Sequence, residues 1–317
     1  MGLKRRVDVL MGGVGGERTI SLKTGRAVAS GLREAGHEVA AVDLQARALP
    51  DFGPTPPEAV FVALHGEFGE DGSIQQMLED EGIPYTGSGP RASRLGMDKL
   101  ASKRLFTRHA IPTADYFSVR DCDPLDRVQE VADQFGYPMV CKPVASGSSL
   151  GVTIARGPAD LPAALTEAHA HGDTVLVERY VPGREFTVGV LEGQALPVVE
   201  MVVPGQFFDY KAKYKDQETR YITPVSLLPT IYRRLTEAAV RAYNALGCRH
   251  MARVDCIYGY DATINVLEVN TIPGFTPRSL LPMAAARAGI GFSELCDRLV
   301  CAAIRDAAAG RRRRLSA

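Results

Sequence analysis

The chain has 317 residues, 45% of them hydrophobic and 23% charged, and its 37 basic residues balance 37 acidic ones. This composition is that of an ordinary soluble globular protein, and the length exceeds what one hydrophobic core usually serves, so two or three domains are expected. A net charge of zero excludes a global field that would attract nucleic acid or a membrane surface.

The chain also lacks the sequence features of membrane, secreted and zinc-binding proteins. No apolar segment approaches the ~18 residues that span a bilayer, and the charged start leads into a short strand rather than a signal sequence. The six cysteines are scattered and include no Cys-x-x-Cys pair. We therefore expect a reduced, cytoplasmic protein without a disulfide framework or a zinc site.

The first third of the chain alternates predicted strands and helices. Strands are expected at residues 7–11, 38–43, 59–64 and 83–86, and helices at 21–35 and 73–81. Glycine-rich loops follow the first and third strands. This rhythm predicts a parallel sheet whose functional loops lie at the carboxyl ends of its strands.

A second unit begins near Asp98. Its predicted helices are 99–109, 126–135 and 159–169, and its predicted strands are 114–118, 140–143, 152–155 and 175–180. The loop 144–151 joins two of these strands and is rich in glycine and serine. Small residues let backbone N–H groups approach an anion and serine hydroxyls add donors, so this loop, with Lys142 just before it, is typical of a phosphate-binding site.

The last unit opens with predicted strands 184–191 and 195–203. The polar, aromatic loop 204–223 that follows is too long to be a mere connector. A helix at 230–246, two strands at 252–258 and 264–269, and a helix at 292–309 come after it.

The two strands after residue 250 carry the most informative side chains. A short turn joins them into a hairpin, and residues two apart on a strand face the same side, so Arg253 joins Asp255 and Glu268 joins Asn270. Two carboxylates and an amide oxygen are hard ligands suited to Mg²⁺ that shares substrate phosphates. The arginine can hold charge that develops on a reacting oxygen. A solvated hairpin face is the alternative, and four such residues followed by a Pro-Gly turn disfavour it.

Two other familiar motifs in the chain are typical of other functions, but each departs from its usual pattern. The run 13–18 has Arg18 in place of the last glycine of a dinucleotide fingerprint, so the close helix–sheet contact is missing. The run 147–151 matches Gly-x-Ser-x-Gly around Ser149, but a β-branched segment follows where a hydrolase nucleophile needs a helix. Because no Gly-Lys-Ser or Gly-Lys-Thr occurs, a P-loop is excluded as well.

Taken in order, a set of short phrases resembles the ATP-grasp enzymes. These phrases are Met97-Asp98-Lys99, Cys141-Lys142-Pro143, Gly147-Ser148-Ser149, Val177-Glu178, Tyr180, Glu185-Phe186-Thr187, Arg253-Val254-Asp255 and Glu268-Val269-Asn270. Further phrases at residues 63–72, 85–89, 210–214 and 270–282 narrow the resemblance to the D-alanine–D-alanine ligase family. The match covers nearly the whole chain, and the phrases are weak singly but highly specific together.

The resemblance implies a mixed α/β, three-domain ATP-grasp fold with an N-terminal parallel-sheet domain. A substrate domain is expected at residues 1–97, a central ATP-grasp subdomain at 98–181, and a C-terminal subdomain at 182–317 with a closing loop at about 203–223. The implied activity is ATP- and Mg-dependent ligation of two D-alanines through a D-alanyl phosphate, for peptidoglycan precursor synthesis.

The family pattern also implies how ATP and its metal ions are held between the second and third units. Lys99 and Lys142 would bind phosphates, Ser149 would cap a phosphate, and Lys213 would contact the nucleotide. The strand residues Glu178 to Tyr180 would hold the adenine edge, and Glu185 the ribose hydroxyls. The oxygen ligands of two Mg²⁺ or Mn²⁺ ions would be Asp255, Glu268 and Asn270.

The first D-alanine is expected at the N-terminal domain. There Glu17 resembles the residue that pairs with its ammonium group, and Ser148 and Tyr214 would hydrogen-bond with Glu17. His65 would lie near the amino acids.

The second D-alanine is expected beside the C-terminal subdomain. Its carboxylate would be bound by Ser279, the Leu280 N–H and Lys213. Arg253 and the Gly274 N–H would stabilise the tetrahedral oxyanion.

Two alternatives stay open. One is a D-alanine–D-lactate ligase or another D-amino-acid ligase of the same fold, although Tyr214 favours the dipeptide because ester-forming relatives often carry histidine there. The other is a non-catalytic ATP-binding regulator, which the presence of Lys142, Arg253 and Asp255 disfavours. The expected partners are D-alanine, ATP and a second copy of the chain, with neither nucleic acid nor membrane.

Overall fold

The N-terminal unit is built on a parallel sheet, as the alternation of strands and helices predicts. The computed structural model describes residues 3–145, 147, 150–202 and 219–315. In this unit the strand order is β2-β1-β3 and both pairings are parallel, with β1 (Arg6–Gly12), β2 (Glu38–Leu44) and β3 (Ala59–Val62). Its helices are α1 (Arg18–Glu34), α2 (Ser73–Asp80) and α3 (Pro90–Met97).

Some expected boundaries in this unit are wrong. The strand expected at 83–86 is only an isolated bridge between Val60 and Tyr85, because Pro84 has no N–H to donate to a strand ladder. Helix α1 begins three residues before the expected start at 21. Helix α3 was not predicted, although Pro90 at its first turn is a common signal of a helix start.

The central unit is an antiparallel sheet covered by helices on one face. The strand order is β4-β7-β5-β6, with β4 (Tyr116–Arg120), β5 (Met139–Pro143), β6 (Thr153–Ala155) and β7 (Thr174–Arg179), and the covering helices are α5 (Leu125–Phe135) and α6 (Leu161–His169). Cys141 and Val177 pack under these helices. Since side chains alternate along a strand, Lys142 and Glu178 point to the opposite face.

The C-terminal unit holds a larger antiparallel sheet. The strand order is β11-β10-β8-β12-β13, with β9 beside β8; the elements are β8 (Gly183–Leu191), β9 (Gln194–Ala195), β10 (Val199–Val202), β11 (Arg220–Ile222), β12 (Met251–Gly259), β13 (Ile264–Asn270), α8 (Pro229–Leu246) and α9 (Leu280–Arg287). The single strand expected at 195–203 is wrong, because Pro197 interrupts it. Strand β11 occupies the end of the segment expected as a loop, and α9 was not predicted.

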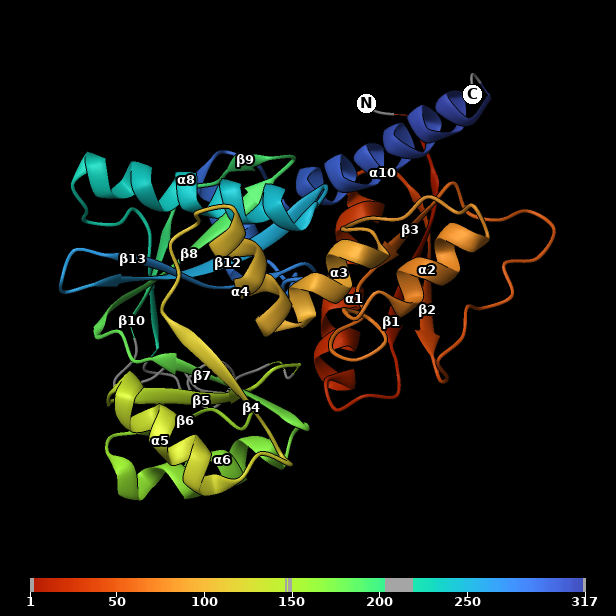
Figure 1. Ribbon diagram of the computed structural model, residues 1–317. Helices are drawn as coiled ribbons and strands as arrows, with labels where there is room; N and C mark the ends of the chain where they lie inside the picture. The colour runs from red at the N-terminus through yellow and green to blue at the C-terminus, as the bar shows by residue number, and fades with distance from the viewer. Residues whose placement is uncertain (1–2, 146, 148–149, 203–218, 316–317) are drawn as a thin grey trace.

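Helix α4 (Lys99–Arg108) follows α3 directly but packs away from the N-terminal sheet. Its Phe106 is fully buried in one core with Leu235 of α8 and Val254 of β12. Figure 1 shows α4 beside α8 and β13, above the central sheet.

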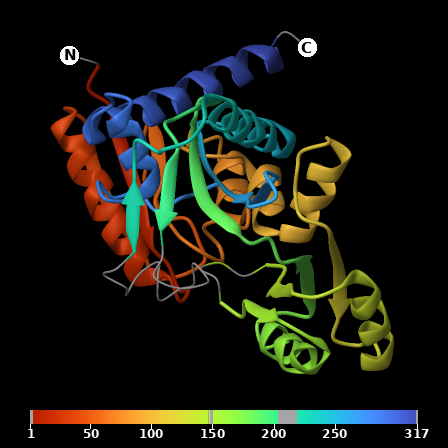
Figure 2. The same cartoon turned by 90° about the vertical axis from the view of Figure 1, so that its left-hand side faces the viewer.

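Helix α10 (Phe292–Leu315) connects the two ends of the chain in space. It runs from the C-terminal unit across the N-terminal sheet (Figures 1 and 2). Leu299 of α10 shares a core with Val9 of β1 and Phe61 of β3. Of the described helices, none is both long and apolar enough to cross a membrane.

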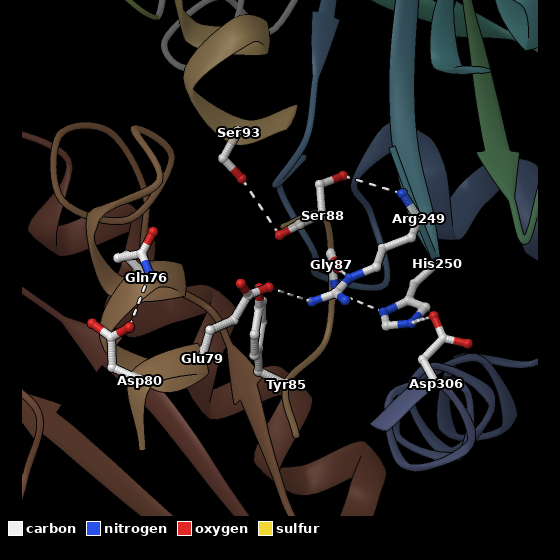
Figure 3. A network of polar contacts seen from close by, with 10 residues as sticks. All are labelled: Gln76, Glu79, Asp80, Tyr85, Gly87, Ser88, Ser93, Arg249, His250 and Asp306. Atoms are coloured by element: carbon white, nitrogen blue, oxygen red, sulfur yellow. Dashed lines mark hydrogen bonds and ion pairs between the residues drawn. The ribbon is translucent and has the colours of Figure 1, made fainter. Parts of the chain in front are cut away.

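Polar contacts join the loop 85–88 of the N-terminal unit to the start of β12, as Figure 3 shows. Arg249 donates from Nε to the Gly87 carbonyl at 3.0 Å, and its guanidinium lies 4.7 Å from the centre of the Tyr85 ring. Next to it, His250 accepts the Gly87 N–H at Nδ1 (3.1 Å) and contacts Asp306 of α10 through Nε2 (3.0 Å). These bonds seat the N-terminal unit against the strand that leads to Arg253.

Candidate active site

A cavity of about 690 Å³ lies where the N-terminal and C-terminal units meet. Segments far apart in sequence contribute to it: the start of α1, the loop after β3, the start of α4, the β12–β13 hairpin and the start of α9. Half of the residues predicted from sequence line it, namely Glu17, His65, Lys99, Arg253, Glu268, Asn270, Gly274, Ser279 and Leu280. The fold therefore brings the two expected amino-acid sites and the hairpin to one space.

The hairpin prediction is confirmed. In the antiparallel pairing of β12 and β13, Arg253 lies opposite Asn270 and Asp255 opposite Glu268, and the register shifts just after Asp255. Residues opposite each other in such a pair point to the same face. The two carboxylates, the amide and the guanidinium therefore share one face of the sheet.

Asp255 is 5% exposed and is held by donors from two strands. Arg253 donates to it twice, from Nε at 2.9 Å and from Nη2 at 2.8 Å, and Thr187 of β8 donates from Oγ1 at 2.6 Å. Thr187 belongs to the phrase Glu185-Phe186-Thr187 of the family resemblance, but it was given no role from sequence. The signal was its position two residues after Glu185, because β8 pairs with β12 so that Thr187 faces Asp255.

The other two oxygen-bearing side chains are also fixed by the protein. Glu268 Oε2 lies 3.5 Å from the Lys99 ammonium. Asn270 Oδ1 accepts the Ile272 N–H at 2.9 Å, and Ile272 is buried in the core of the N-terminal unit beside Leu10. The loop after the hairpin is thus anchored in the neighbouring unit.

On the N-terminal wall, Gly66 allows close approach to Glu17. A Cβ on Gly66 would lie 2.6 Å from Glu17 Oε2, and one on Gly147 would lie 3.8 Å from the same oxygen. Gly66 also has φ of +69°, a left-handed conformation that favours glycine. The carboxylate therefore sits between the loop after β3 and the glycine-serine loop of the central unit.

His65 is buried at the edge of the cavity in a chain of polar contacts. Its Nε2 is 2.9 Å from Thr24 Oγ1 and its Nδ1 is 3.2 Å from Glu70 Oε1. Thr24 and Glu70 line the cavity, but neither was assigned a role from sequence. Helical spacing from Glu17 indicates the Thr24 position, because residues seven apart lie on one face of a helix.

On the C-terminal wall, Ser279 stands immediately before α9. Its Oγ accepts the Thr276 N–H at 3.0 Å, and Leu280 is the first residue of the helix. The first N–H groups of a helix lack intrahelical partners and carry partial positive charge, so they favour an anion. A Cβ on Gly274 would lie 3.5 Å from Ser279 Oγ, which brings the expected oxyanion donor to the same place.

Lys142 and Glu178 lie apart from this cavity lining, on the face of the central sheet opposite α5 and α6. Both are nearly buried, and Glu178 forms ion pairs with Lys142 and with Lys103 of α4. Burial opposes ionisation of Glu178, but the charges of Lys142 and Lys103 outweigh it and hold its pKa below the usual value. Lys103 was not identified from sequence, although it lies four residues, about one helical turn, after Lys99.

The remaining predicted residues that the structure describes, Asp255, Tyr180 and Glu185, are not among those that line the cavity. Tyr180 follows β7 and Glu185 lies on β8, and both are half-buried. The predictions for Ser148, Ser149, Lys213 and Tyr214, and for residues 203–218 of the closing loop, concern residues outside those that the structure describes.

Comparison with known proteins identifies the family of this arrangement. Residues 47–88 match the model of the D-ala D-ala ligase N-terminus, and residues 105–301 match that of the D-ala D-ala ligase C-terminus. The chain is 43% identical over 301 residues to a D-alanine–D-alanine ligase of Syntrophotalea carbinolica, which covers 95% of this chain and 96% of the relative. It is 46% identical over 303 residues to one of Acidiphilium cryptum, with 93% and 97% covered.

Solved structures agree with these relatives. A D-alanine–D-alanine ligase from Bacillus anthracis complexed with ATP superimposes with a TM-score of 0.84 at 31% identity, over 96% of this chain and 99% of that one. A VanG D-Ala:D-Ser ligase from Enterococcus faecalis gives a TM-score of 0.84 at 28% identity, over 95% and 100%. The fold is the three-part ATP-grasp architecture, and the chain belongs to the D-alanine–D-alanine ligase family.

Proposed function

We propose that the protein joins two D-alanines into D-alanyl-D-alanine with conversion of ATP to ADP and phosphate, for peptidoglycan precursor synthesis. The observation that carries this proposal is the convergence, on one cavity, of Glu17, the oxygen-bearing hairpin and the start of α9. A carboxylate suits an ammonium group and a helix N-terminus suits a carboxylate, so the two walls match the two ends of amino-acid substrates.

The donor set of the hairpin fits divalent metal ions. Asp255 and Glu268 lie opposite each other, and Asn270 adds an amide oxygen on the same face. Such hard oxygen donors are the ligands that Mg²⁺ and Mn²⁺ prefer. We assign two such ions to these three residues; when bound, they neutralise charge on the phosphate oxygens during transfer.

In the first step, the carboxylate of the first D-alanine attacks the γ-phosphorus of ATP, which gives D-alanyl phosphate and ADP. Glu17 orients the substrate through its ammonium group, with Ser148 and Tyr214 assigned to Glu17 and His65 nearby. Phosphoryl transfer depends on positioning and on charge stabilisation. We assign Lys99, Lys142 and Ser149 to the phosphates of the nucleotide. The strand residues Glu178 to Tyr180 are assigned to adenine and Glu185 to ribose, and Lys213 also contacts the nucleotide.

In the second step, the amine of the second D-alanine attacks the acyl carbon, and phosphate leaves with the electron pair of the broken C–O bond. Ser279, the Leu280 N–H and Lys213 hold the carboxylate of this substrate. Arg253 and the Gly274 N–H stabilise the negative oxygen of the tetrahedral intermediate. The segment 203–223 is assigned as the loop that keeps water from the acyl phosphate.

We also propose a functional division at residues 1–97, 98–181 and 182–317, a homodimeric assembly, and a cytoplasmic location, where ATP is available. Analytical ultracentrifugation tests the assembly: sedimentation as a monomer at micromolar concentration contradicts the dimer.

The function is tested by phosphate release from ATP and Mg²⁺ with D-alanine, L-alanine or no amino acid, with products weighed by mass spectrometry. We expect release that depends on D-alanine and a product with the mass of the dipeptide. Because the D-Ala:D-Ser ligase from Enterococcus faecalis shares the fold, D-serine and D-lactate are offered as second substrates. A preference for D-serine or D-lactate contradicts the assignment of D-alanyl-D-alanine as the product. ATP binding without turnover contradicts the enzymatic function and indicates a regulator.

A further inference from the structure

A lysine without exposure to solvent lies next to the expected phosphate-binding lysine. Lys103 of α4 is 0% exposed. Its ammonium contacts the Glu178 carboxylate, donates to Thr113 Oγ1 at 2.7 Å and to the Ala114 carbonyl at 3.1 Å, and lies 5.4 Å from the centre of the Tyr116 ring. Burying a lysine is costly unless its charge is paired, so this position calls for an explanation.

The hydrogen bonds around Lys103 indicate that it is protonated. The Thr113 hydroxyl donates its own proton to the Val266 carbonyl at 2.8 Å, so towards Lys103 it can only accept. The Ala114 carbonyl also accepts, and the Glu178 carboxylate forms an ion pair with the same nitrogen. Two accepting oxygens and a paired carboxylate suit an ammonium, which has three N–H donors and a positive charge, and not a neutral amine, which has two N–H donors and no charge. Burial lowers the pKa of Lys103, and the charge of Glu178 opposes that effect.

The net charge of the cluster formed by Lys103, Glu178 and Lys142 depends on Lys103. Glu178 lies between two lysines, Lys103 and Lys142. With both protonated, the three groups carry a net charge of +1. Without Lys103, Lys142 and Glu178 would form a neutral ion pair, which has little attraction for an anion. In a nearly dry interior, where charges are weakly screened, this difference is large.

We propose that Lys103 is a positioning residue that neutralises Glu178 from the protein interior and so leaves the charge of Lys142 for the phosphates of the nucleotide. The inference rests on the proposed function, because it takes Lys142 as a phosphate ligand. Through Thr113 and Val266, Lys103 also ties the start of the central sheet to β13, which carries Glu268 and Asn270.

The test is calorimetric titration of the full chain with ADP and with adenosine, at fixed MgCl₂. Lys103→Met removes the charge and keeps a long side chain. We expect the dissociation constant for ADP to rise by about 10- to 100-fold, the range found for residues that orient metal ligands, while that for adenosine changes less than about twofold. A ratio of the two constants equal to that of the wild type overturns the proposal. If both ligands lose affinity equally, the residue has a structural role.

A double variant tests the charge count itself. Lys103→Met with Glu178→Gln restores a net +1, so the ADP-to-adenosine ratio should return toward that of the wild type, and a ratio that stays altered contradicts the proposal. The ratio cancels any effect of Glu178→Gln on adenine binding. Should Lys103→Met fail to fold, Lys103→Gln keeps hydrogen-bond donors without the charge and serves the same comparison.

These results separate the inference from the function on which it rests. A wild-type protein that binds no ADP contradicts the proposed function. A wild type that binds ADP and forms the dipeptide, beside a Lys103→Met variant with an unchanged ratio, contradicts only the role of Lys103.

Discussion

At the scale of single residues, side chains on the hairpin face form hydrogen bonds with one another. Arg253, assigned to the oxyanion, forms two hydrogen bonds with Asp255, assigned to a metal ion. Each group is thereby paired although it is nearly buried, which avoids the cost of an isolated charge. The hydroxyl of Thr187 adds a third donor to the same carboxylate. The geometry of Asp255 therefore depends on residues that need not touch substrate.

Replacement of Arg253 tests its role in the second step. Arg253→Met removes the donor assigned to the tetrahedral oxyanion, so kcat for dipeptide formation should fall by about 100- to 1000-fold, as is typical for loss of one such donor. Steady-state phosphate release measures this effect. Arg233→Met, on the exposed side of α8, is the matched control and should leave kcat unchanged. A comparable loss in both variants would show that the effect is not local.

Replacement of Thr187 tests whether the orientation of Asp255 matters for the metal ions. Thr187→Val keeps the shape and removes the hydroxyl, so the Mg²⁺ concentration that gives half-maximal rate should rise by about tenfold. Thr187→Ser retains the donor and should restore most of the wild-type value. The same Mg²⁺ dependence in Thr187→Val and wild type would refute the orienting role.

At the level of elements, the close approach of α1 to β1 depends on one glycine. A Cβ on Gly25 would lie 2.4 Å from Met11 Cβ, a distance that packed atoms do not reach. The helix can therefore lie on the sheet only because position 25 has no side chain. Since Glu17 precedes α1 and Thr24 lies on it, this contact also sets the N-terminal wall of the cavity.

The variant Gly25→Ala should destabilise the protein by about 1–3 kcal/mol, the usual cost of overpacking a core. Thermal unfolding followed by circular dichroism measures the loss. Gly157→Ala is the control, because no atom lies within 4 Å of its added Cβ. Equal melting temperatures for the two variants would mean that α1 shifts at no cost.

Local patterns were sufficient to predict much of this architecture. Alternation along strands predicted the hairpin face, and the order of strands and helices predicted the parallel sheet. By contrast, helix α9 was missed although the sequence carries signals for it: Ser279 at its N-cap, Pro282 in its first turn, and the alanines that follow. Pro197 was a visible signal of the break between β9 and β10, but apolar residues on both sides concealed it.

Other parts of the site depend on tertiary structure and could not be read from local pattern. Lys103 meets Glu178 only because α4 leaves the N-terminal unit and packs against α8 and β13, above the central sheet. Thr187 meets Asp255 only through the pairing of β8 with β12. Both contacts join residues more than 60 positions apart, and a pattern within one element contains no information on such pairs.

At the scale of the whole molecule, two histidines fasten α10 in the same way. His37 accepts the Arg5 N–H at Nδ1 and contacts Asp297 through Nε2 at 2.9 Å. His250 accepts the Gly87 N–H and contacts Asp306. One histidine belongs to the N-terminal unit and the other to the C-terminal unit, so α10 is bound to both. An imidazole that accepts at Nδ1 is neutral, and protonation removes that bond.

His250 should make stability dependent on pH. Burial and the charge of Arg249 lower the pKa of His250 to about 4, against the opposing charge of Asp306. The unfolded chain takes up a proton near pH 6.5, so this contribution to stability is complete above pH 6.5 and is lost as the pH falls toward 4. Between pH 7 and pH 5 the loss is on the order of 2 kcal/mol.

The measurement is the melting temperature at pH 7 and pH 5 for wild type and His250→Gly. Glycine suits the φ of +60° at this position, so the variant removes the imidazole without adding backbone strain. We expect the melting temperature of the wild type to fall further between the two pH values. The charged groups around the imidazole, Arg249, Arg305 and Asp306, stay in both proteins. Parallel pH dependence would show that His250 does not contribute.

The position of α10 has a consequence for synthesis on the ribosome. Leu299 and its neighbours complete the core against β1 and β3, and Phe292 lies against Gly31 of α1. About 200 residues separate the end of α3 from this helix, which corresponds to roughly 10–40 s of translation. During that time the first unit to emerge has an open apolar face. The nascent chain must therefore wait for its last helix before this face of its first sheet, which α1 covers in part, is complete. A chaperone can bind the exposed apolar residues during that time.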